Sequence, residues 1–266
     1  MKIMSCEFTF AVCAYKDSPY LEEAVRSAAS QTVDAKVLVA TSTPSDYISN
    51  IARKYNAEYF VNPEPGKGIA ADWMFALSCA KTPYAVIAHQ DDVYFPEYAE
   101  RVLKAFRKNP DSLIVFTDYG DLMDDGKVHK NRFYLWIKRF LLLPFYFKHA
   151  LRSRFGKQSA VRFGNAISCP TVSYNLSVLG EFKFDTSYSV NLDWAMWLML
   201  SERKGAFVFV PRSLMAHRIS GEMETAAAIR DNRRFQEDFR IFERIWGKKM
   251  AGFLMKFYRY ACKANN

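Results

Sequence analysis

The stretch Tyr84-Ala-Val-Ile-Ala-His-Gln-Asp-Asp-Val-Tyr94 joins a short apolar run to a polar end. Residues 84–88 predict a buried strand, because the run is brief and lies between helical patterns. Asp91 and Asp92 follow at the carboxyl end of that strand, where open α/β sheets bind ligands. Two adjacent carboxylates repel each other, so the pair favours a cation, and Mg²⁺ or Mn²⁺ suits such hard oxygen ligands. Taken alone, the pair fits a solvated acidic loop equally well.

Apolar strand patterns alternate with helical patterns along the first 120 residues. We expect strands at residues 8–14, 36–40, 58–61, 84–88 and 113–116, and helices near 19–28, 47–55, 70–80 and 98–106. In the first helix, Ser18 is the expected cap and Pro19 the expected first residue. This alternation predicts an α/β fold, with a mostly parallel sheet flanked by helices.

The net charge of +9 is concentrated in two segments. Residues 126–180 contain ten Lys and Arg, residues 247–266 contain five, and neither segment has an acid. The aromatic, leucine-rich stretch at 133–147 makes residues 126–160 a predicted basic helical insertion. This insertion either docks on an anionic membrane surface or only covers the active site. Its longest apolar run is far shorter than the ~20 residues that span a bilayer.

The rest of the composition indicates one domain in a reducing compartment. Five scattered cysteines without paired spacing argue against a disulfide framework or a zinc site and favour the cytoplasm. No long apolar run occurs near the N-terminus, so a cleaved signal peptide is not expected. With the basic insertion, this predicts a peripheral protein on the inner face of the cell membrane. We expect a single domain over 1–266 that ends in a helical segment at 226–266.

Two polar residues stand out later in the chain. Asp193 lies beside Trp194 in the first turn of an apolar helix pattern at 190–200. It either complements the helix dipole or serves as a general base. His217 follows a strand pattern at 206–210, and a lone histidine of this kind is more often a hydrogen-bonded structural residue than a ligand.

Five segments, in this order, resemble the motifs of the family-two glycosyltransferases of the GT-A fold. They are residues 8–31, the helix start at 68–73, His-Gln-Asp-Asp at 89–92, residues 180–194 and Met-Ala-His-Arg at 215–218. The resemblance covers nearly the whole chain except 125–158 and the C-terminal tail. It implies a GT-A (Rossmann-like) sheet and metal-dependent, inverting transfer of a sugar from a nucleotide diphosphate sugar, such as a UDP-sugar. The acceptor is expected to be a hydroxyl of a saccharide or lipid-linked molecule in surface polysaccharide assembly.

The resemblance also implies roles for single residues. Asp193 is the expected base, and Asp91 is the expected ligand of Mn²⁺ or Mg²⁺. His217 is a second ligand or a phosphate contact, while Asp92 and Trp194 support the site. The residues expected around the nucleotide are Cys13, Ala14, Tyr15, Thr41, Ala71, Asp72, His89 and Gln90.

The sequence departs from the family pattern at several positions. They are Ala40-Thr41 in place of Asp-Asp, Asp72 in place of Arg, His89 in place of the first Asp of Asp-x-Asp, and Leu192 in place of Glu. These departures favour an alternative, a non-catalytic module that binds a nucleotide sugar or a membrane. Retention of Asp91, Asp92, Asp193 and His217 together opposes it. Nucleic-acid binding is disfavoured, because the basic residues are interleaved with leucines and no nucleic-acid motif occurs. A nucleotidyltransferase is disfavoured too, because no Gly-rich, Arg-containing loop follows the first strand.

Overall fold

The computed structural model describes residues 6–219 and 233–263. The strands are β1 (Phe8–Ala14), β2 (Lys36–Thr41), β3 (Glu58–Val61), β4 (Tyr84–His89), β5 (Val93–Tyr94), β6 (Ser112–Leu122), β7 (Val128–His129), β8 (Ala150–Leu151), β9 (Val172–Asn175) and β10 (Ala206–Arg218). The helices are α1 (Leu21–Ala29), α2 (Asp46–Lys54), α3 (Ile69–Ser78), α4 (Tyr98–Lys108), α5 (Phe133–Leu141), α6 (Leu143–Phe147), α7 (Arg154–Gln158), α8 (Leu176–Leu179), α9 (Leu192–Ser201), α11 (Arg233–Trp246) and α12 (Lys248–Lys263).

The described strands form one sheet in the order β3-β2-β1-β4-β9-β6-β10-β5, with β7 paired to β6 and β8 to β10. Strands β1 to β4 run parallel to one another, and β6 runs parallel to β10. Strand β9 is antiparallel to both of its neighbours, β4 and β6. The α/β prediction with a mostly parallel sheet is therefore confirmed.

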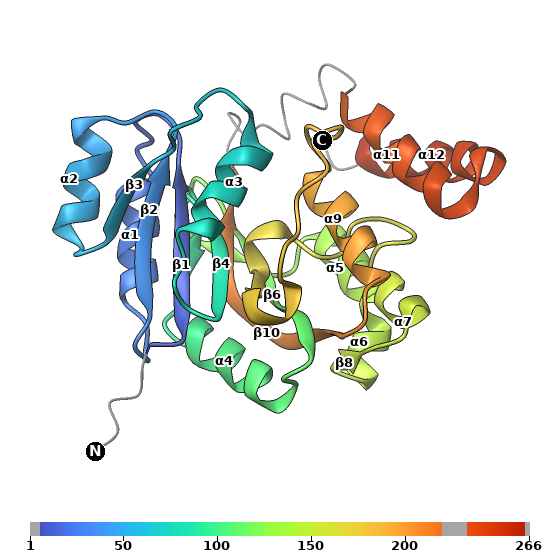
Figure 1. Cartoon of the computed structure of the whole chain (residues 1–266). Helices are drawn as coiled ribbons and strands as arrows, with labels where there is room; N and C mark the ends of the chain where they lie inside the picture. The colour runs from blue at the N-terminus through green and yellow to red at the C-terminus, as the bar shows by residue number, and fades with distance from the viewer. Residues whose placement is uncertain (1–5, 220–232, 264–266) are drawn as a thin grey trace.

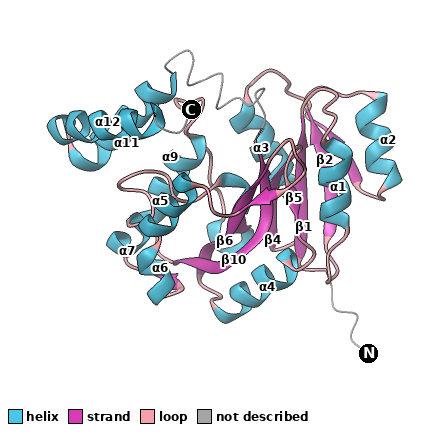
Figure 2. Cartoon of the chain, turned by 180° about the vertical axis from the view of Figure 1, so that it is seen from behind, coloured by secondary structure: helices cyan, strands magenta, loops and turns pink. Residues whose placement is uncertain are grey.

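Helices cover both faces of the sheet. Successive side chains of a strand point to opposite faces, and here apolar side chains on both faces need covering. Phe8, Phe10 and Val12 of β1 pack with α1, α2 and α4 on one face, whereas Ala11 packs against α3 on the other. Figure 2 shows α1 and α4 in front of the sheet in the view from behind. Helices α3 and α9 lie on the opposite face, toward the viewer in Figure 1.

The predicted insertion is helical and packs into the body of the protein. Leu135 of α5 joins the core on the α1 face, and Phe145 of α6 joins the core on the α9 face. Ile241 of α11 and Ala251 of α12 belong to the second of these cores, and the two helices lie together beyond α9 (Figure 1). The single domain stays a prediction, which this shared packing supports. Residues 226–232 and 264–266 of the predicted C-terminal segment lie outside the described residues. No described helix has the length and apolarity to cross a membrane.

The predicted start of the first helix was wrong. Helix α1 begins at Leu21, with Tyr20 as its N-cap and no side-chain cap. The hydroxyl of Ser18 instead accepts a hydrogen bond from the backbone N–H of Tyr20 at 3.3 Å, which makes a turn before the helix. The strand predicted at 206–210 is the first part of a longer, bulged strand, β10, which continues to Arg218.

Gly205 allows the tight entry into β10. Its φ is +116°, and a Cβ there would lie 2.6 Å from the carbonyl oxygen of Asp111. We expect Gly205→Ala to lower the free energy of unfolding by roughly 1–3 kcal/mol, because backbone strain adds to the clash. Thermal or urea unfolding measures the change. Gly252→Ala in α12 is the control, since a Cβ there meets nothing within 4 Å. Equal losses in the two variants would contradict the assignment.

Candidate active site

The carboxyl end of β4 presents three candidate metal ligands. His89, Asp91 and Asp92 each offer one ligand atom, and these three atoms lie within 4.8 Å of one another. Asp92 is fully buried, and its Oδ2 lies 3.6 Å from Nδ1 of His89. Among the described residues, neither Oδ2 of Asp92 nor Nε2 of His89 has a hydrogen-bond partner. Carboxylate oxygens beside an imidazole suit Mn²⁺, and the carboxylates also suit Mg²⁺, so this group fits a divalent cation.

The end of β10 fixes this acidic turn. Oδ1 of Asp92 is 2.9 Å from Nδ1 of His217 and accepts the backbone N–H of Arg218 at 3.0 Å. Burial opposes the charge on Asp92, but His217, His89 and the N–H of Arg218 together outweigh burial, so the pKa of the Asp92 carboxyl is lowered. Burial also opposes the charge on His217, yet Asp92 raises the pKa of this imidazole. Arg218 donates to the carbonyl of Asp91 at 2.9 Å and to Glu23 of α1 at 2.5 Å.

Asp91 lies in the same turn but is only half-buried. Burial and then repulsion from Asp92 raise the pKa of the Asp91 carboxyl. A bound cation would offset both effects. His217 uses Nδ1 for Asp92, so only its Nε2 is left for a ligand. The assignment of His217 to the metal or to phosphate stays a prediction.

The predicted nucleotide residues gather at the ends of β1 and β2 and the start of α3. Asp72 accepts hydrogen bonds from Ser42 at 3.0 Å and from Asn62 at 2.9 Å, which ties α3 to the loops after β2 and β3. Thr41 is buried, and its hydroxyl accepts the N–H of Thr43 at 3.0 Å. Asp72 and Thr41 therefore hold these loops in place through contacts within the protein.

Tyr15 and Gln90 join the end of β1 to the end of β4. The side-chain amide of Gln90 accepts the N–H of Tyr15 at 2.8 Å and donates to its carbonyl at 3.1 Å. Tyr15 is 53% exposed, and the Lys16 ammonium lies 5.3 Å from the centre of its ring. The other predicted contacts nearby are Cys13 and Ala14 in β1 and Ala71 in α3. Burial, followed by the charge of Asp72, raises the pKa of the Cys13 thiol, which keeps it protonated.

His89 is oriented by an aromatic contact that the sequence did not suggest. The ring of Trp73 stacks on the ring of His89 with centroids 5.3 Å apart and planes 15° apart. Phe184 packs edge-on against Trp73 at 5.3 Å. Helix α3 and the segment before α9 thus hold the His89 imidazole in the turn.

Asp193 lies in the first turn of α9, half-buried. Its carboxylate accepts the side-chain amide of Asn165 at 2.8 Å and the N–H of Trp194 at 2.7 Å. Burial raises the pKa of Asp193 despite these hydrogen bonds. Trp194 is fully buried, and its indole N–H donates to the carbonyl of Val161 at 2.8 Å, so it holds α9 in the core.

The charges of the base candidate and of the acidic turn both influence one buried thiol, Cys169. Burial raises the pKa of Cys169, and the charges of Asp193 and Asp92 raise it further. Cys169 begins the short 3-10 turn Cys169–Thr171 that leads into β9. That Asp193 and the metal-ligand candidates form one site stays a prediction.

Helix α11 holds the loop that leads into α9. The Glu237 carboxylate accepts the N–H groups of Ser189, Val190 and Asn191 at 2.7–3.0 Å, and also the hydroxyl of Ser189 at 2.8 Å. These hydrogen bonds lower the pKa of Glu237, although burial opposes them. Sequence reasoning missed this contact, and it fixes the segment that carries Asp193.

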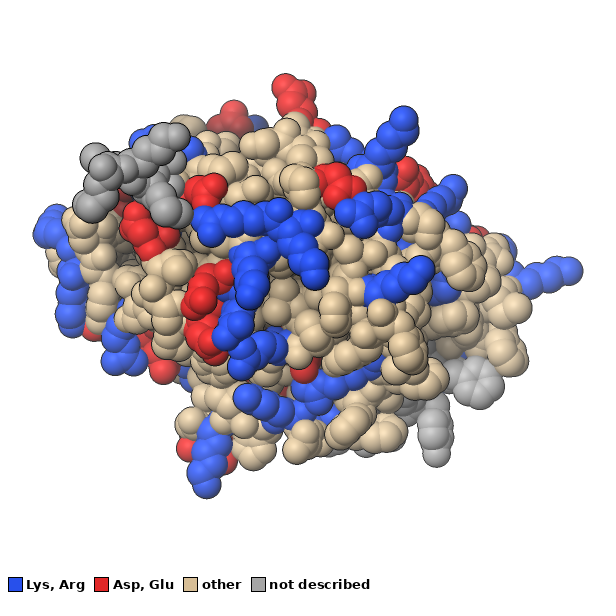
Figure 3. All heavy atoms as spheres, turned by 90° about the horizontal axis from the view of Figure 1, so that it is seen from below, with Lys and Arg blue, Asp and Glu red and all other residues tan. Residues whose placement is uncertain are grey.

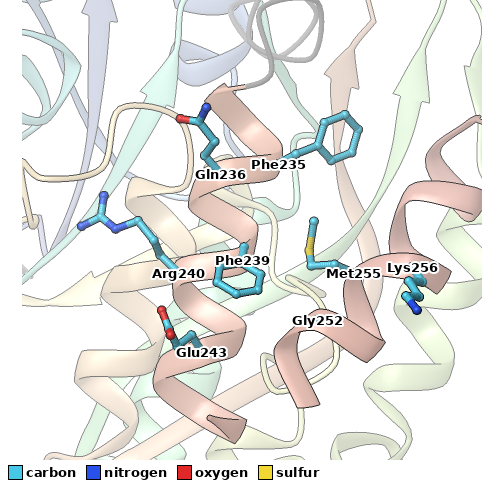
Figure 4. Close-up of a pocket in the computed structure, with 8 residues that line it drawn as sticks. All are labelled: Phe235, Gln236, Phe239, Arg240, Glu243, Gly252, Met255 and Lys256. Carbon is cyan, nitrogen blue, oxygen red and sulfur yellow. The ribbon is translucent and has the colours of Figure 1, made fainter. Parts of the chain in front are cut away.

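A groove of about 630 Å³ lies between parts of α11 and α12 (Figure 4). Phe239 and Met255 face each other across it, and Arg240 and Lys256 lie toward its edges. The lining residues of α11 lie on a different face of that helix from Glu237. The groove is therefore distinct from the contacts that position Asp193.

A family model described as "Glycosyl transferase family 2" matches residues 9–168, which is more than half of the chain. The chain belongs to glycosyl transferase family 2. The match includes the acidic turn after β4, so the predicted family is confirmed. No curated protein matches the chain.

Solved structures share the fold of this family 2 chain. TarS from S. aureus has a TM-score of 0.61 at 15% identity, covering 88% of this chain and 39% of its own. TarS 1–349 in complex with UDP has a TM-score of 0.61 at 13% identity, and the match covers 94% of this chain and 69% of the TarS chain. The mannosyltransferase PcManGT from Pyrobaculum calidifontis, in complex with GDP-Man and Mn²⁺, has a TM-score of 0.62 at 16% identity, and the match covers 98% of this chain and 76% of PcManGT. The chain thus spans well under half of the longer TarS structure, and at this identity the likeness establishes the GT-A fold alone.

Asp238 gives the contact between α11 and α9 a pH dependence. It is buried, and Asn191 donates to its Oδ1 at 2.7 Å. Burial raises the pKa of Asp238 to about 6. Because the folded state holds this proton more tightly, ionisation of Asp238 costs stability as the pH rises through about 4 to 6.

We expect Asp238→Asn to raise the free energy of unfolding at pH 8 by up to about 3 kcal/mol. The gain should be smaller at pH 5, and urea unfolding at both values measures it. Glu243→Gln, an exposed carboxylate on the same helix, is the control. The same gain at both pH values, or an equal pH effect in the control, would refute the assignment.

Proposed function

We propose that this chain is a metal-dependent, inverting glycosyltransferase of the hexosyltransferase type. It moves a sugar from a nucleotide diphosphate sugar, most simply a UDP-sugar, to a hydroxyl of a saccharide or lipid-linked acceptor in surface polysaccharide assembly. The observation that carries this is the group of His89, Asp91 and Asp92, with a buried, unpartnered oxygen on Asp92, in a family 2 chain. The similar structures solved with UDP, UDP-GlcNAc, or GDP-Man and Mn²⁺ support it.

The chemistry follows from one base and a stabilised leaving group. Asp193 takes the proton from the acceptor hydroxyl, and the oxygen attacks the anomeric carbon from the face opposite the diphosphate. As the new C–O bond forms, the bond to the phosphate oxygen breaks, and its electron pair leaves with the nucleoside diphosphate. Asp91, with Asp92 and His89, would hold Mn²⁺ or Mg²⁺, which neutralises charge on the diphosphate when bound. No enzyme nucleophile is needed.

The nucleotide lies over the ends of β1 and β2 in this proposal. The exposed ring of Tyr15 stacks on the base, and the backbone at Cys13 and Ala14 lies beside it. Gln90 supports Tyr15 through their paired hydrogen bonds. Asp72 acts through Ser42 and Asn62, which it holds in place.

The alternative is a module that binds a nucleotide sugar without turnover. Purified protein with a panel of nucleotide sugars and Mn²⁺ separates the two, first by thermal shift and then by release of nucleoside diphosphate. The enzyme releases nucleoside diphosphate from one donor and loses this activity in EDTA. Stabilisation by a donor without any release would establish the module instead.

Two substitutions separate the base from the metal site. Asp193→Asn should lower kcat by roughly 10²–10⁴-fold and leave the Kd of the donor nearly unchanged, because the base acts on the acceptor. Asp91→Ala should weaken Mn²⁺-dependent donor binding about tenfold or more.

In the wild type, kcat should fall as the pH drops through the raised pKa of Asp193, since only the ionised form accepts a proton. Substantial transfer by Asp193→Asn would eliminate it as the base.

We also propose a peripheral, cytoplasmic position on the inner face of the cell membrane. Phe133, Trp136, Phe140 and Phe147 of the insertion are all more than half exposed, beside basic residues such as Lys148. Exposed aromatics next to cations suit an anionic bilayer surface. Figure 3 shows the molecule from below, where a band of Lys and Arg is bordered by Asp and Glu.

Vesicle flotation tests this surface. The wild type should float with anionic vesicles and less with neutral ones, and Phe140→Ser with Phe147→Ser should reduce flotation several-fold. Val178→Ser, an exposed apolar residue outside the insertion, is the control and should float like the wild type. If the wild type stays in solution with both kinds of vesicle, the membrane proposal is wrong.

A further inference from the structure

The inserted helix α5 is anchored to the carboxyl end of β6. Arg132 binds buried Asp121 at 3.1 Å, and Tyr134 also donates to that carboxylate. Arg139 binds Asp118 at 3.0 Å. These contacts pair two of the helix's cations with carboxylates and fix its position.

Lys138, which precedes Arg139, has a different environment. Its ammonium donates to the hydroxyl of Tyr119 at 2.9 Å and lies 5.4 Å from the centre of that ring. The side chain is half-buried, and no described carboxylate lies within the 4.0 Å of an ion pair. An ammonium has three donors, and only one of these is used by a described protein group. A partly desolvated cation without a counter-ion is costly unless an anion binds to it.

Lys138 also lies close to the proposed active site. The ring of Tyr119 meets the ring of His217 edge-on, with centroids 6.3 Å apart, and His217 in turn binds Asp92. The ammonium therefore lies next to a tyrosine that contacts the acidic turn.

We propose that Lys138 binds the diphosphate of the donor and stabilises the negative charge that develops on the leaving phosphate oxygen. This rests on the proposed function, since it assigns a residue to that reaction. A charge-assisted hydrogen bond from an ammonium is suited to a phosphate oxygen, and it strengthens as the oxygen gains charge. The insertion then supplies a catalytic group, whether or not its outer aromatics reach a membrane.

Lys138→Met tests the assignment, because methionine keeps most of the side chain's length and apolar stem but removes the charge. Calorimetry with Mn²⁺ compares UDP and GDP with the nucleosides uridine and guanosine. The variant should bind the preferred nucleoside diphosphate roughly 10- to 100-fold more weakly, with the affinity for its nucleoside unchanged. With the donor found by nucleoside diphosphate release, kcat should fall as well. Lys138→Arg should restore part of both losses.

Lys127→Met, which removes an exposed cation from the same insertion, is the control and should match the wild type. Unchanged diphosphate affinity and kcat in Lys138→Met would overturn the proposal while leaving the proposed function intact. Equal losses for nucleoside and nucleoside diphosphate would also overturn it, since that is the result of disturbed folding. If the wild type neither binds a nucleoside diphosphate nor releases one, the proposed function fails and this inference with it.

Discussion

The buried contact between Asp92 and His217 connects the end of β4 to the end of β10 and holds the acidic turn in its observed shape. A carboxylate withdrawn from water loses several kcal/mol of solvation unless other groups compensate it. His217 and the N–H of Arg218 compensate one of its oxygens, but no described group forms a hydrogen bond with the other, which lies 3.6 Å from Nδ1 of His89. A cation bound at this point would complete the arrangement electrostatically.

The other side of the site depends on contacts between distant segments. Asn165 orients Asp193, and Glu237 on α11 holds the loop before α9. The matched family region ends at residue 168, so Asp193, His217 and α11 all lie beyond it. His89, Asp91 and Asp92 lie inside it.

Much of the fold could be predicted from local patterns. Strands β1 and β3 match the predicted residues, because their apolar runs are short and bounded by polar residues. The predicted cap at Ser18 was wrong because its hydroxyl accepts the N–H of Tyr20 instead. The sequence pattern does not show which of these two local hydrogen bonds Ser18 forms. Strand β9 was missed, since its four residues carry no periodic signal of their own.

The site was predictable to the extent that its residues follow strands. Asp91, Asp92 and His217 were found in this way, whereas Asn62, which directly follows β3, carried the same signal and was overlooked. The partners Asn165, Glu237 and Trp73 had no such signal, because their roles arise from contacts between segments far apart in the chain. The sequence left two roles open for His217, a hydrogen-bonded structural residue or a ligand. In the structure its Nδ1 contacts Asp92, so this nitrogen has the structural role.

The central claim is that the turn after β4 is a divalent cation site, and anomalous diffraction from a crystal grown with Mn²⁺ and UDP or GDP tests it most directly. The account predicts a manganese peak within about 2.5 Å of a carboxylate oxygen of Asp91 or Asp92. A bound nucleotide with no manganese at this turn, or with manganese held only by other residues, would contradict it.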